Sequence, residues 1–198
     1  MYINLGFIMK QVYILPGYEP LTKYNHLSKL FKKLSINAKI IKYPWDKIIL
    51  TNYIKNFKKE YIAQDKIYIL GFSFGAMAAL ISSIKLKPNL LIICSLSDYF
   101  SEDIALMNKM QLKEEEIALG KERINDFKKY KLNILLKQIR CKTIILAGKE
   151  EPKGIIKNSK KAKKLIKNSE LIIIPKAKHN MFQKDYFNTL KTIISRLN

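Results

Sequence analysis

A serine flanked by two glycines stands where a buried strand gives way to a helix. The segment Gly71-Phe72-Ser73-Phe74-Gly75 follows the apolar run Lys66–Leu70 and precedes a stretch rich in alanine. In a G-x-S-x-G turn of this kind the serine adopts a strained backbone conformation, and side chains at either glycine would collide with neighbouring backbone. The turn lifts the Ser73 hydroxyl clear of the sheet at a helix N-terminus, whose dipole favours developing negative charge. The pattern therefore predicts that Ser73 is a nucleophile.

Two histidines are available to activate this serine, which is a weak nucleophile without a base. His26 lies within an amphipathic segment, off its main apolar row, as is typical of a solvated helix residue. His179 lies between the last expected strand and the last expected helix, at the same sheet edge as Ser73. We therefore expect His179 to act as the base.

A carboxylate should orient the histidine and stabilise its charged form. After the fifth expected strand, Glu150 and Glu151 follow Gly148, and a carboxylate here completes the chain order of serine, acid and histidine. Loop spacing favours Glu151, and Glu150 is the alternative. Asp98 follows the fourth expected strand and could reach the same histidine, so it is a further candidate for the acid.

Two backbone amides are needed to stabilise the oxyanion that forms when a serine attacks a carbonyl. The amide of Phe74, directly after the nucleophile, is the first candidate. The second is the amide of Tyr18 in the loop after the first expected strand, because Gly17 permits a turn that points this amide inward. An ordinary Pro-Gly turn at Pro16-Gly17 is the alternative interpretation.

Short apolar runs alternate with amphipathic segments along the chain, which predicts a parallel sheet covered by helices on both faces. Ligands of such sheets bind beyond the carboxyl ends of the strands, where the residues above lie. We expect one domain over residues 1–198, a three-layer α/β/α sandwich whose mostly parallel sheet has about six strands. The expected strands are Gln11–Leu15, Ala38–Tyr43, Lys66–Leu70, Asn89–Ser95, Thr143–Ala147 and Glu170–Ile174.

Helical spacing of apolar residues locates the covering layers. The first helix is expected over residues 21–34, and Asp46 is expected to cap the second. The third follows Ser73 as Phe74–Leu86, and a Lys-rich helix separates the last two strands. The final helix is expected to bury Tyr186, Phe187, Leu190, Ile193, Ile194 and Leu197.

Residues 99–138 interrupt this alternation, because they contain no strand pattern. We expect a helix start at Ser101, a helical piece Lys113–Leu119 closed by Gly120, and one longer helix that includes Ile124 and Leu135. Two interpretations of the apolar residues in this segment stay open: they line an apolar acyl site, or they are the packing face of crossover helices. These residues are Ile104, Met107, Met110, Ile117 and Phe127.

The chain resembles the α/β-hydrolase superfamily from about Lys10 to its C-terminus. The resemblance rests on GFSFG at residues 71–75, LPGYE at 15–19, AGKEEP at 147–152 and AKHNMF at 177–182. It implies a minimal α/β-hydrolase fold with a small helical lid at residues 99–138. It also implies a serine hydrolase, without cofactor or metal, that cleaves small carboxylic esters or thioesters through an acyl-serine. Its residues would be Ser73, His179 and Glu151, with the amides of Tyr18 and Phe74.

The sequence departs from the superfamily pattern in three places. Pro16-Gly17 stands where the superfamily commonly has His-Gly, and Glu151 stands where the acid is usually an aspartate. There is also no room before Gln11 for the two antiparallel strands that are common in the superfamily. A different class of function, a non-catalytic binding protein on a hydrolase fold, is disfavoured because serine, histidine and acid are all present.

Charge is the unusual feature of the composition, with 37 Lys and Arg against 16 Asp and Glu and a formal net charge of +21. Such a balance suggests nucleic acid, but Arg, which reads bases and phosphates bidentately, occurs only at Arg123, Arg140 and Arg196. The excess of Lys indicates compositional bias, and the basic segment Lys157–Lys167 is expected to be a solvated helix face. An acidic acyl carrier protein, steered to this basic surface, is the alternative substrate carrier.

Further exclusions concern compartment and redox state. No apolar run approaches the roughly 18 residues of a membrane span, and residues 1–9 lack the basic start and cleavage site of a signal peptide. Cys94 and Cys141 form neither a disulfide framework nor a zinc pattern and are expected to be small buried apolar residues. We therefore expect a cytoplasmic protein.

Overall fold

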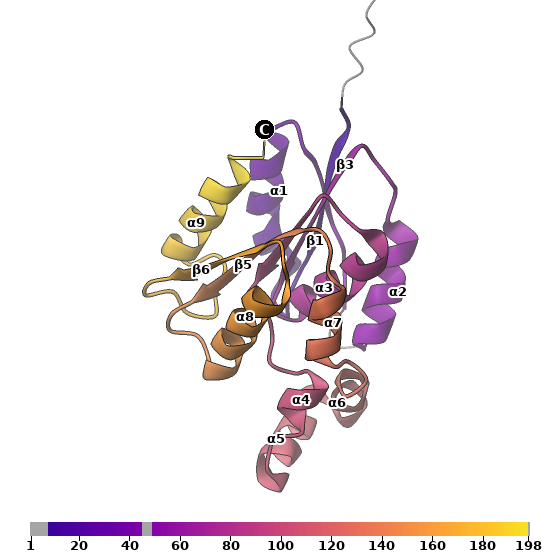
Figure 1. The fold of residues 1–198 in the computed structure, drawn as a ribbon, viewed down its shortest axis with the longest axis vertical. Coiled ribbons are helices and arrows are strands. Elements are labelled where there is room, and N and C mark those ends of the chain that lie inside the picture. Colours follow the sequence, from indigo (N-terminus) through magenta and orange to yellow (C-terminus); the bar gives the residue numbers. More distant parts are fainter. Residues whose placement is uncertain (1–7, 45–48, 198) are drawn as a thin grey trace, which may run out of the picture.

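A parallel sheet runs through the centre of the molecule (Figure 1). The computed structural model describes residues 8–44 and 49–197, and within these the sheet has six strands in the order β2-β1-β3-β4-β5-β6. Every described pairing is parallel, as expected for apolar strands separated by helices. The strands are β1 (Lys10–Leu15), β2 (Asn37–Ile40), β3 (Lys66–Phe72), β4 (Leu90–Cys94), β5 (Lys142–Gly148) and β6 (Ser169–Ile174).

The strand order places the carboxyl ends of neighbouring strands, which the candidate catalytic residues follow, next to one another. From β1 the chain first adds β2 on one side and then crosses to β3 on the other, so the order reverses beside β1. Ligands of open α/β sheets bind at such a reversal. The end of β3 is level with the end of β4, since Phe72 pairs with Cys94. Gly148 at the end of β5 pairs with Ile174 at the end of β6.

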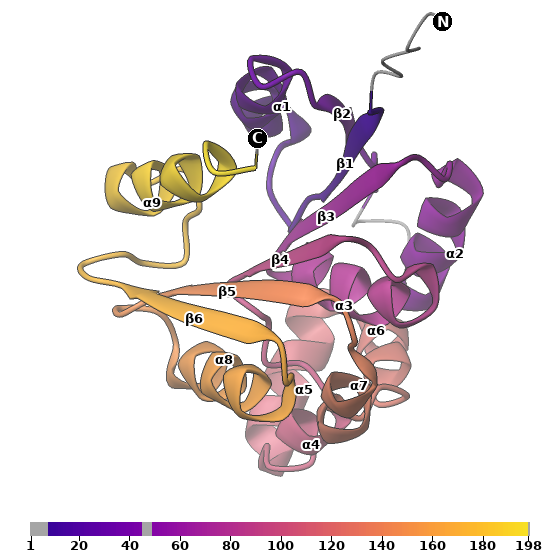
Figure 2. The same ribbon diagram turned by 45° about the horizontal axis from the view of Figure 1, so that its top comes forward.

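Side chains that alternate along each strand point to opposite faces of the sheet and pack into two apolar layers. On β1, Val12 and Ile14 join the layer covered by α1 (Tyr24–Lys32) and α9 (Lys184–Ile194). Tyr13 and Leu15 join the opposite layer, which is covered by α2 (Leu50–Glu60), α3 (Phe74–Leu86) and α8 (Lys153–Leu165). Figure 2 shows α1 and α9 on one side of the sheet and the other three helices on the opposite side. The expected three-layer architecture is therefore confirmed.

The segment after β4 forms α4 (Ser101–Ile104), α5 (Lys109–Leu119), α6 (Lys121–Phe127) and α7 (Leu132–Gln138). Helices α4, α5 and α6 extend beyond the carboxyl ends of the strands, at the bottom of Figure 1. The expectation of one longer helix through Ile124 and Leu135 is wrong, because residues 128–131 separate α6 from α7. The carboxylate of Glu102 accepts hydrogen bonds from the amides of Leu132 and Asn133 at 2.9 and 3.1 Å, which starts a new helix there.

The apolar residues of this segment divide into two groups. Ile104 and Phe127 are buried in the core, and Met107 packs against it, so the packing interpretation describes these three. Met110 and Ile117 are 67% and 76% exposed, so the packing interpretation is wrong for these two, and a contact with an acyl chain stays a prediction.

Smaller differences concern the ends of elements. β2 ends at Ile40 rather than Tyr43, and the first helix begins as a 3-10 turn, η1 (Leu21–Lys23), before α1. The expected helix cap Asp46 lies outside the described residues. His26 is on the exposed side of α1, as expected. Among the helices of the described ranges, none combines the length and apolar character that a bilayer crossing requires.

Candidate active site

Ser73 occupies a strained turn between β3 and α3. Its backbone has φ 55° and ψ −119°, a conformation that costs an L-residue roughly 1–3 kcal/mol. A Cβ on Gly75 would lie 2.0 Å from the carbonyl oxygen of Leu15, and one on Gly71 would lie 2.3 Å from that of Gly75. Both glycines are thus required by close backbone approach. The amide of Ser73 donates to the carbonyl of Cys94 at 3.0 Å, which ties the turn to β4.

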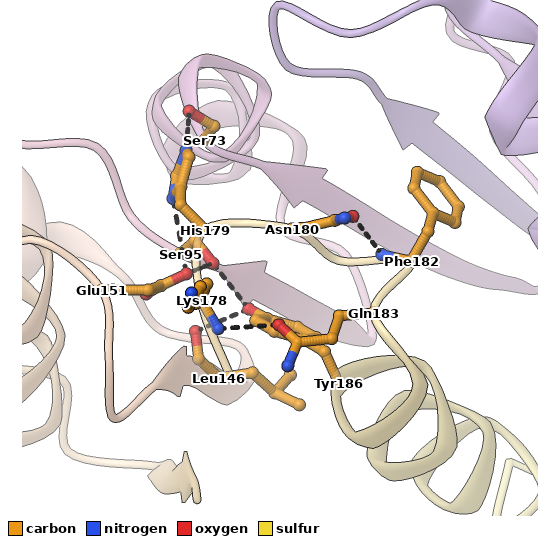
Figure 3. A network of polar contacts seen from close by, with 10 residues as sticks. All are labelled: Ser73, Ser95, Leu146, Glu151, Lys178, His179, Asn180, Phe182, Gln183 and Tyr186. Atoms are coloured by element: carbon orange, nitrogen blue, oxygen red, sulfur yellow. Dashed lines mark hydrogen bonds and ion pairs between the residues drawn. The ribbon is translucent and has the colours of Figure 1, made fainter. Parts of the chain in front are cut away.

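The imidazole of His179 faces this serine from the loop between β6 and α9. Its Nε2 lies 3.0 Å from Oγ of Ser73, within hydrogen-bond distance (Figure 3). The ring stacks on Phe72 with centroids 5.0 Å apart, which fixes its plane. The loop is braced by Gln183, whose side chain accepts from the amide of Lys178 at 2.9 Å and donates to the carbonyl of Lys176 at 2.8 Å.

Glu151 lies on the far side of the imidazole. Its Oε1 is 3.4 Å from Nδ1 of His179, and its side chain is fully buried. The residue follows β5, and its own amide donates to the carbonyl of Gly148 at 3.3 Å in a tight turn. Ser73, His179 and Glu151, which are separated along the sequence, therefore form one continuous series of polar contacts.

The two other carboxylates considered for the acid lie elsewhere. Asp98 faces the start of α8, where a Cβ on Gly154 would lie 1.9 Å from its Oδ2, and burial raises the pKa of Asp98. Glu150 is exposed, with its amide bound to the carbonyl of Ala177 at 2.9 Å. Within the described ranges, no hydrogen bond or ion pair joins either carboxylate to His179.

The loop after β1 packs directly against the serine turn. A Cβ on Gly17 would lie 3.1 Å from Cβ of Ser73, so a side chain here would press on the nucleophile. The amide of Gly17 donates to the hydroxyl of Tyr24 at 3.0 Å, and this hydroxyl donates to the carboxylate of Glu19 at 3.3 Å. Burial raises the pKa of Glu19. The loop is thus held beside Ser73 by a buried tyrosine from α1.

The two residues expected to supply oxyanion amides flank the serine from different elements. Phe74 begins α3, and Tyr18 follows Gly17 with its side chain 59% exposed. The ring of Phe74 packs against Tyr99 and Phe127, with centroids 5.4 and 5.3 Å away. An aromatic cluster therefore joins the serine turn to the segment after β4.

Three further side chains that our sequence reasoning did not single out contact these elements. Tyr24 holds the loop after β1, Tyr99 packs on Phe74, and Ser95 donates a hydrogen bond to Oε1 of Glu151. Tyr99 and Ser95 lie just after β4, so position at a strand end was the available signal. Tyr24 gave no such signal, because its contact depends on how α1 packs on the sheet.

Solved structures of other proteins share this fold, although no match is found at the level of sequence. No protein-family model and no curated protein matches the sequence. Among solved structures, a monoacylglycerol lipase from Paleococcus ferrophilus has a TM-score of 0.73 and 13% identity, over 96% of this chain and 95% of that one. A lipase-esterase related protein from Clostridium acetobutylicum has a TM-score of 0.66 and 22% identity, over 94% and 93%.

A third structure is named for the fold itself. It is the alpha/beta hydrolase domain-containing protein 10 from mouse, with a TM-score of 0.75 and 14% identity, over 94% of this chain and 88% of that one. Together with the parallel sheet and its helical layers, these likenesses define the α/β-hydrolase fold.

Proposed function

We propose that the protein is a serine hydrolase that cleaves carboxylic esters or thioesters through an acyl-Ser73 intermediate. The observation that carries this proposal is the 3.0 Å contact between Nε2 of His179 and Oγ of Ser73 at a strained strand-to-helix turn. A nucleophile within hydrogen-bond reach of a base, which an acid in turn faces, is the arrangement that acyl transfer requires. The esterase and lipase names of structural neighbours agree with this class of reaction.

The reaction proceeds in two half-reactions. Nε2 of His179 takes the proton of Ser73 as Oγ attacks the carbonyl carbon of the substrate. The tetrahedral intermediate collapses, the bond to the alcohol or thiol breaks, and His179 returns the proton to this leaving group. Water then attacks the acyl-serine with His179 again as the base, which releases the carboxylic acid and regenerates Ser73.

Charge develops at two places during each half-reaction. The imidazolium of His179 is stabilised by the buried carboxylate of Glu151, 3.4 Å from Nδ1, and such contacts often shorten in the Michaelis complex. The oxyanion is stabilised by the amides of Tyr18 and Phe74 and by the N-terminus of α3, on which Ser73 stands. Each donor of this kind contributes about 100-fold or more to the rate.

A fluorophosphonate probe tests the proposal, since it labels only an activated serine. We expect labelling of the wild type and none of Ser73→Ala, with His179→Ala slowed by about 1,000-fold or more. A panel of p-nitrophenyl esters of rising chain length, measured with the same variants, then reports the acyl preference. A folded wild type that neither labels nor hydrolyses any ester would reject the proposal and favour a binding protein on this fold.

The net charge of +21 suggests an alternative source of substrate, an acidic acyl carrier protein. An acyl group on an acidic carrier protein would be attracted to such a surface, and screening by salt would weaken the attraction. Esters or thioesters linked to the carrier should then be cleaved faster than free ones at low ionic strength. Equal rates at low and high salt would leave the free small-molecule ester as the substrate.

A further inference from the structure

Ser95 lies next to the nucleophile, one strand along the sheet. It directly follows β4, is fully buried, and donates its amide to the carbonyl of Leu146 at 2.8 Å. Its φ is 54°, a region that glycine enters freely and that other L-residues enter at a cost of about 1–2 kcal/mol. A serine stands at a position where glycine would relieve strain, which points to a role for its hydroxyl.

The hydroxyl of Ser95 donates to Oε1 of Glu151 (Figure 3). This is the same oxygen that faces Nδ1 of His179 at 3.4 Å. Oε2 of Glu151 is buried and accepts no hydrogen bond from the residues in the described ranges. Within those ranges, Ser95 is therefore the one side chain that donates a hydrogen bond to this carboxylate, whereas Nδ1 of His179 faces it at 3.4 Å without a hydrogen bond.

Tyr186 completes the support from α9. Its hydroxyl lies 2.8 Å from Oγ of Ser95 and 3.2 Å from the carbonyl oxygen of Leu146. Burial raises the pKa of Tyr186, so the phenol keeps its proton. Because the single proton of Ser95 is directed to the carboxylate of Glu151, the phenol donates to Oγ of Ser95 or to Leu146. Ser95 is thereby held in the rotamer that faces Glu151.

We infer that Ser95 is a positioning residue that aligns Oε1 of Glu151 with His179, with Tyr186 as its support. The inference rests on the proposed hydrolase function. A buried glutamate has several rotatable bonds, and one strong charge-assisted hydrogen bond is enough to select a single rotamer. Glycine at this position would relieve the strain at Ser95 but would lose this hydrogen bond.

Paired substitutions separate positioning from stability. Ser95→Ala removes the hydroxyl and keeps the strain, whereas Ser95→Gly removes both. We expect both variants to lower kcat by about 10- to 100-fold with KM within about twofold, because displacement of a catalytic group by about 1 Å has an effect of this size. Ser95→Gly should melt at a higher temperature than Ser95→Ala. Tyr186→Phe should lower kcat less than either.

The control is Ser159→Ala, which removes a buried hydroxyl on α8 that has no partner in the described ranges, and we expect unchanged kcat. A double-mutant cycle supplies the decisive readout. If Ser95 acts through Glu151, Ser95→Ala should change kcat by less than about twofold in a Glu151→Ala background. Additive losses, or Ser95 variants as active as the wild type, would overturn the inference while leaving the hydrolase function standing. A wild type inactive toward esters and the probe would reject both.

Discussion

Oε1 of Glu151 lies 3.4 Å from Nδ1 of His179, and the carboxylate reaches this position from a turn that begins at Gly148. Gly148 itself is pressed against the histidine loop, since a Cβ there would lie 2.2 Å from the carbonyl oxygen of Ala177. The end of β5 and the loop after β6 are therefore in direct backbone contact. The extra methylene of a glutamate, relative to aspartate, lengthens the reach of the carboxylate from this turn to Nδ1 of the imidazole.

Glu151→Gln tests this relationship directly. The amide cannot stabilise an imidazolium as a carboxylate does, and it also presents a donor to Nδ1, so we expect kcat to fall by about 100-fold or more. The matched controls are Glu150→Gln and Asp98→Asn, which should stay within about threefold of the wild type. Hydrolysis of a p-nitrophenyl ester under saturating conditions measures all three. A larger loss in either control would move the acid to that residue.

The ionisation of Asp98 should instead change the stability of the folded protein with pH. Burial raises its pKa, so the folded chain binds this proton more tightly than the unfolded chain, whose carboxyl has a pKa of about 3.9. The stability that this proton adds is present below the pKa of Asp98 in the unfolded chain. It is lost as pH rises through the pKa of Asp98 in the folded chain. Asp98→Asn removes the charge, so we expect it to melt above the wild type at pH 7.

The comparison must be repeated at low pH. Near pH 3 both proteins carry a neutral side chain at position 98, and the advantage of Asp98→Asn should disappear. Thermal melts of the two proteins across this range provide the measurement. A variant less stable than the wild type at pH 7 would show that the ionised carboxylate stabilises the start of α8.

The local parts of this molecule could be predicted from sequence. The turn at Ser73 and the helix Phe74–Leu86 were expected with their observed bounds, because a strand, two glycines and a run of alanines act over neighbouring residues. Most strands were found for the same reason, since their central residues form continuous apolar runs, whereas the polar strand β2 was expected with other bounds. Catalytic roles for Ser73, His179 and Glu151 remain predictions, but their proximity followed from the rule that parallel strands share one carboxyl edge.

Contacts between distant segments could not be predicted in the same way. Three carboxylates follow strands at one edge, and only the packed structure shows that Asp98 faces Gly154 while Glu151 faces His179. The break between α6 and α7 depends on Glu102, whose carboxylate caps a helix 30 residues further along the chain. No periodicity within residues 121–138 carries that information.

Tyr24 provides a test of the loop that is expected to hold the oxyanion. Tyr24→Phe removes the acceptor of the Gly17 amide and leaves a buried donor unpaired, which costs about 1–3 kcal/mol in the free energy of unfolding. Because the backbone of Gly17 lies close beside Ser73, we also expect a displaced loop to lower kcat by about 10-fold. Chemical denaturation and ester hydrolysis give the two values.

Tyr68→Phe is the matched control, because Tyr68 packs in the same apolar layer as Tyr24. It should change the unfolding free energy by less than about 0.5 kcal/mol. If Tyr24→Phe behaves like this control, the hydrogen bond to Gly17 is not what places the loop.

Asp126 should determine how firmly residues 101–127 are attached to the rest of the fold. Its side chain is almost completely buried and accepts from the amide and the hydroxyl of Thr51 at 2.8 and 2.6 Å, which ties α6 to the first turn of α2. Lys129 donates to the same carboxylate at 2.8 Å. Asp126→Ala leaves the Thr51 amide unpaired at a cost of about 1–3 kcal/mol. We therefore expect faster hydrogen exchange and proteolysis within residues 101–127, with the sheet strands still protected.

The same variant tests whether this segment is a lid over an acyl site. Loosening a lid that contacts the acyl chain should raise KM for long-chain esters and leave short-chain esters unaffected, because only the long chain would reach it. Asn125→Ala, an exposed neighbour on α6, is the control and should alter neither exchange nor KM. Faster exchange without a chain-length effect would mean that residues 99–138 pack on the fold without contacting substrate. Unchanged hydrogen exchange would show that the contact between Asp126 and Thr51 is not what attaches residues 101–127 to α2.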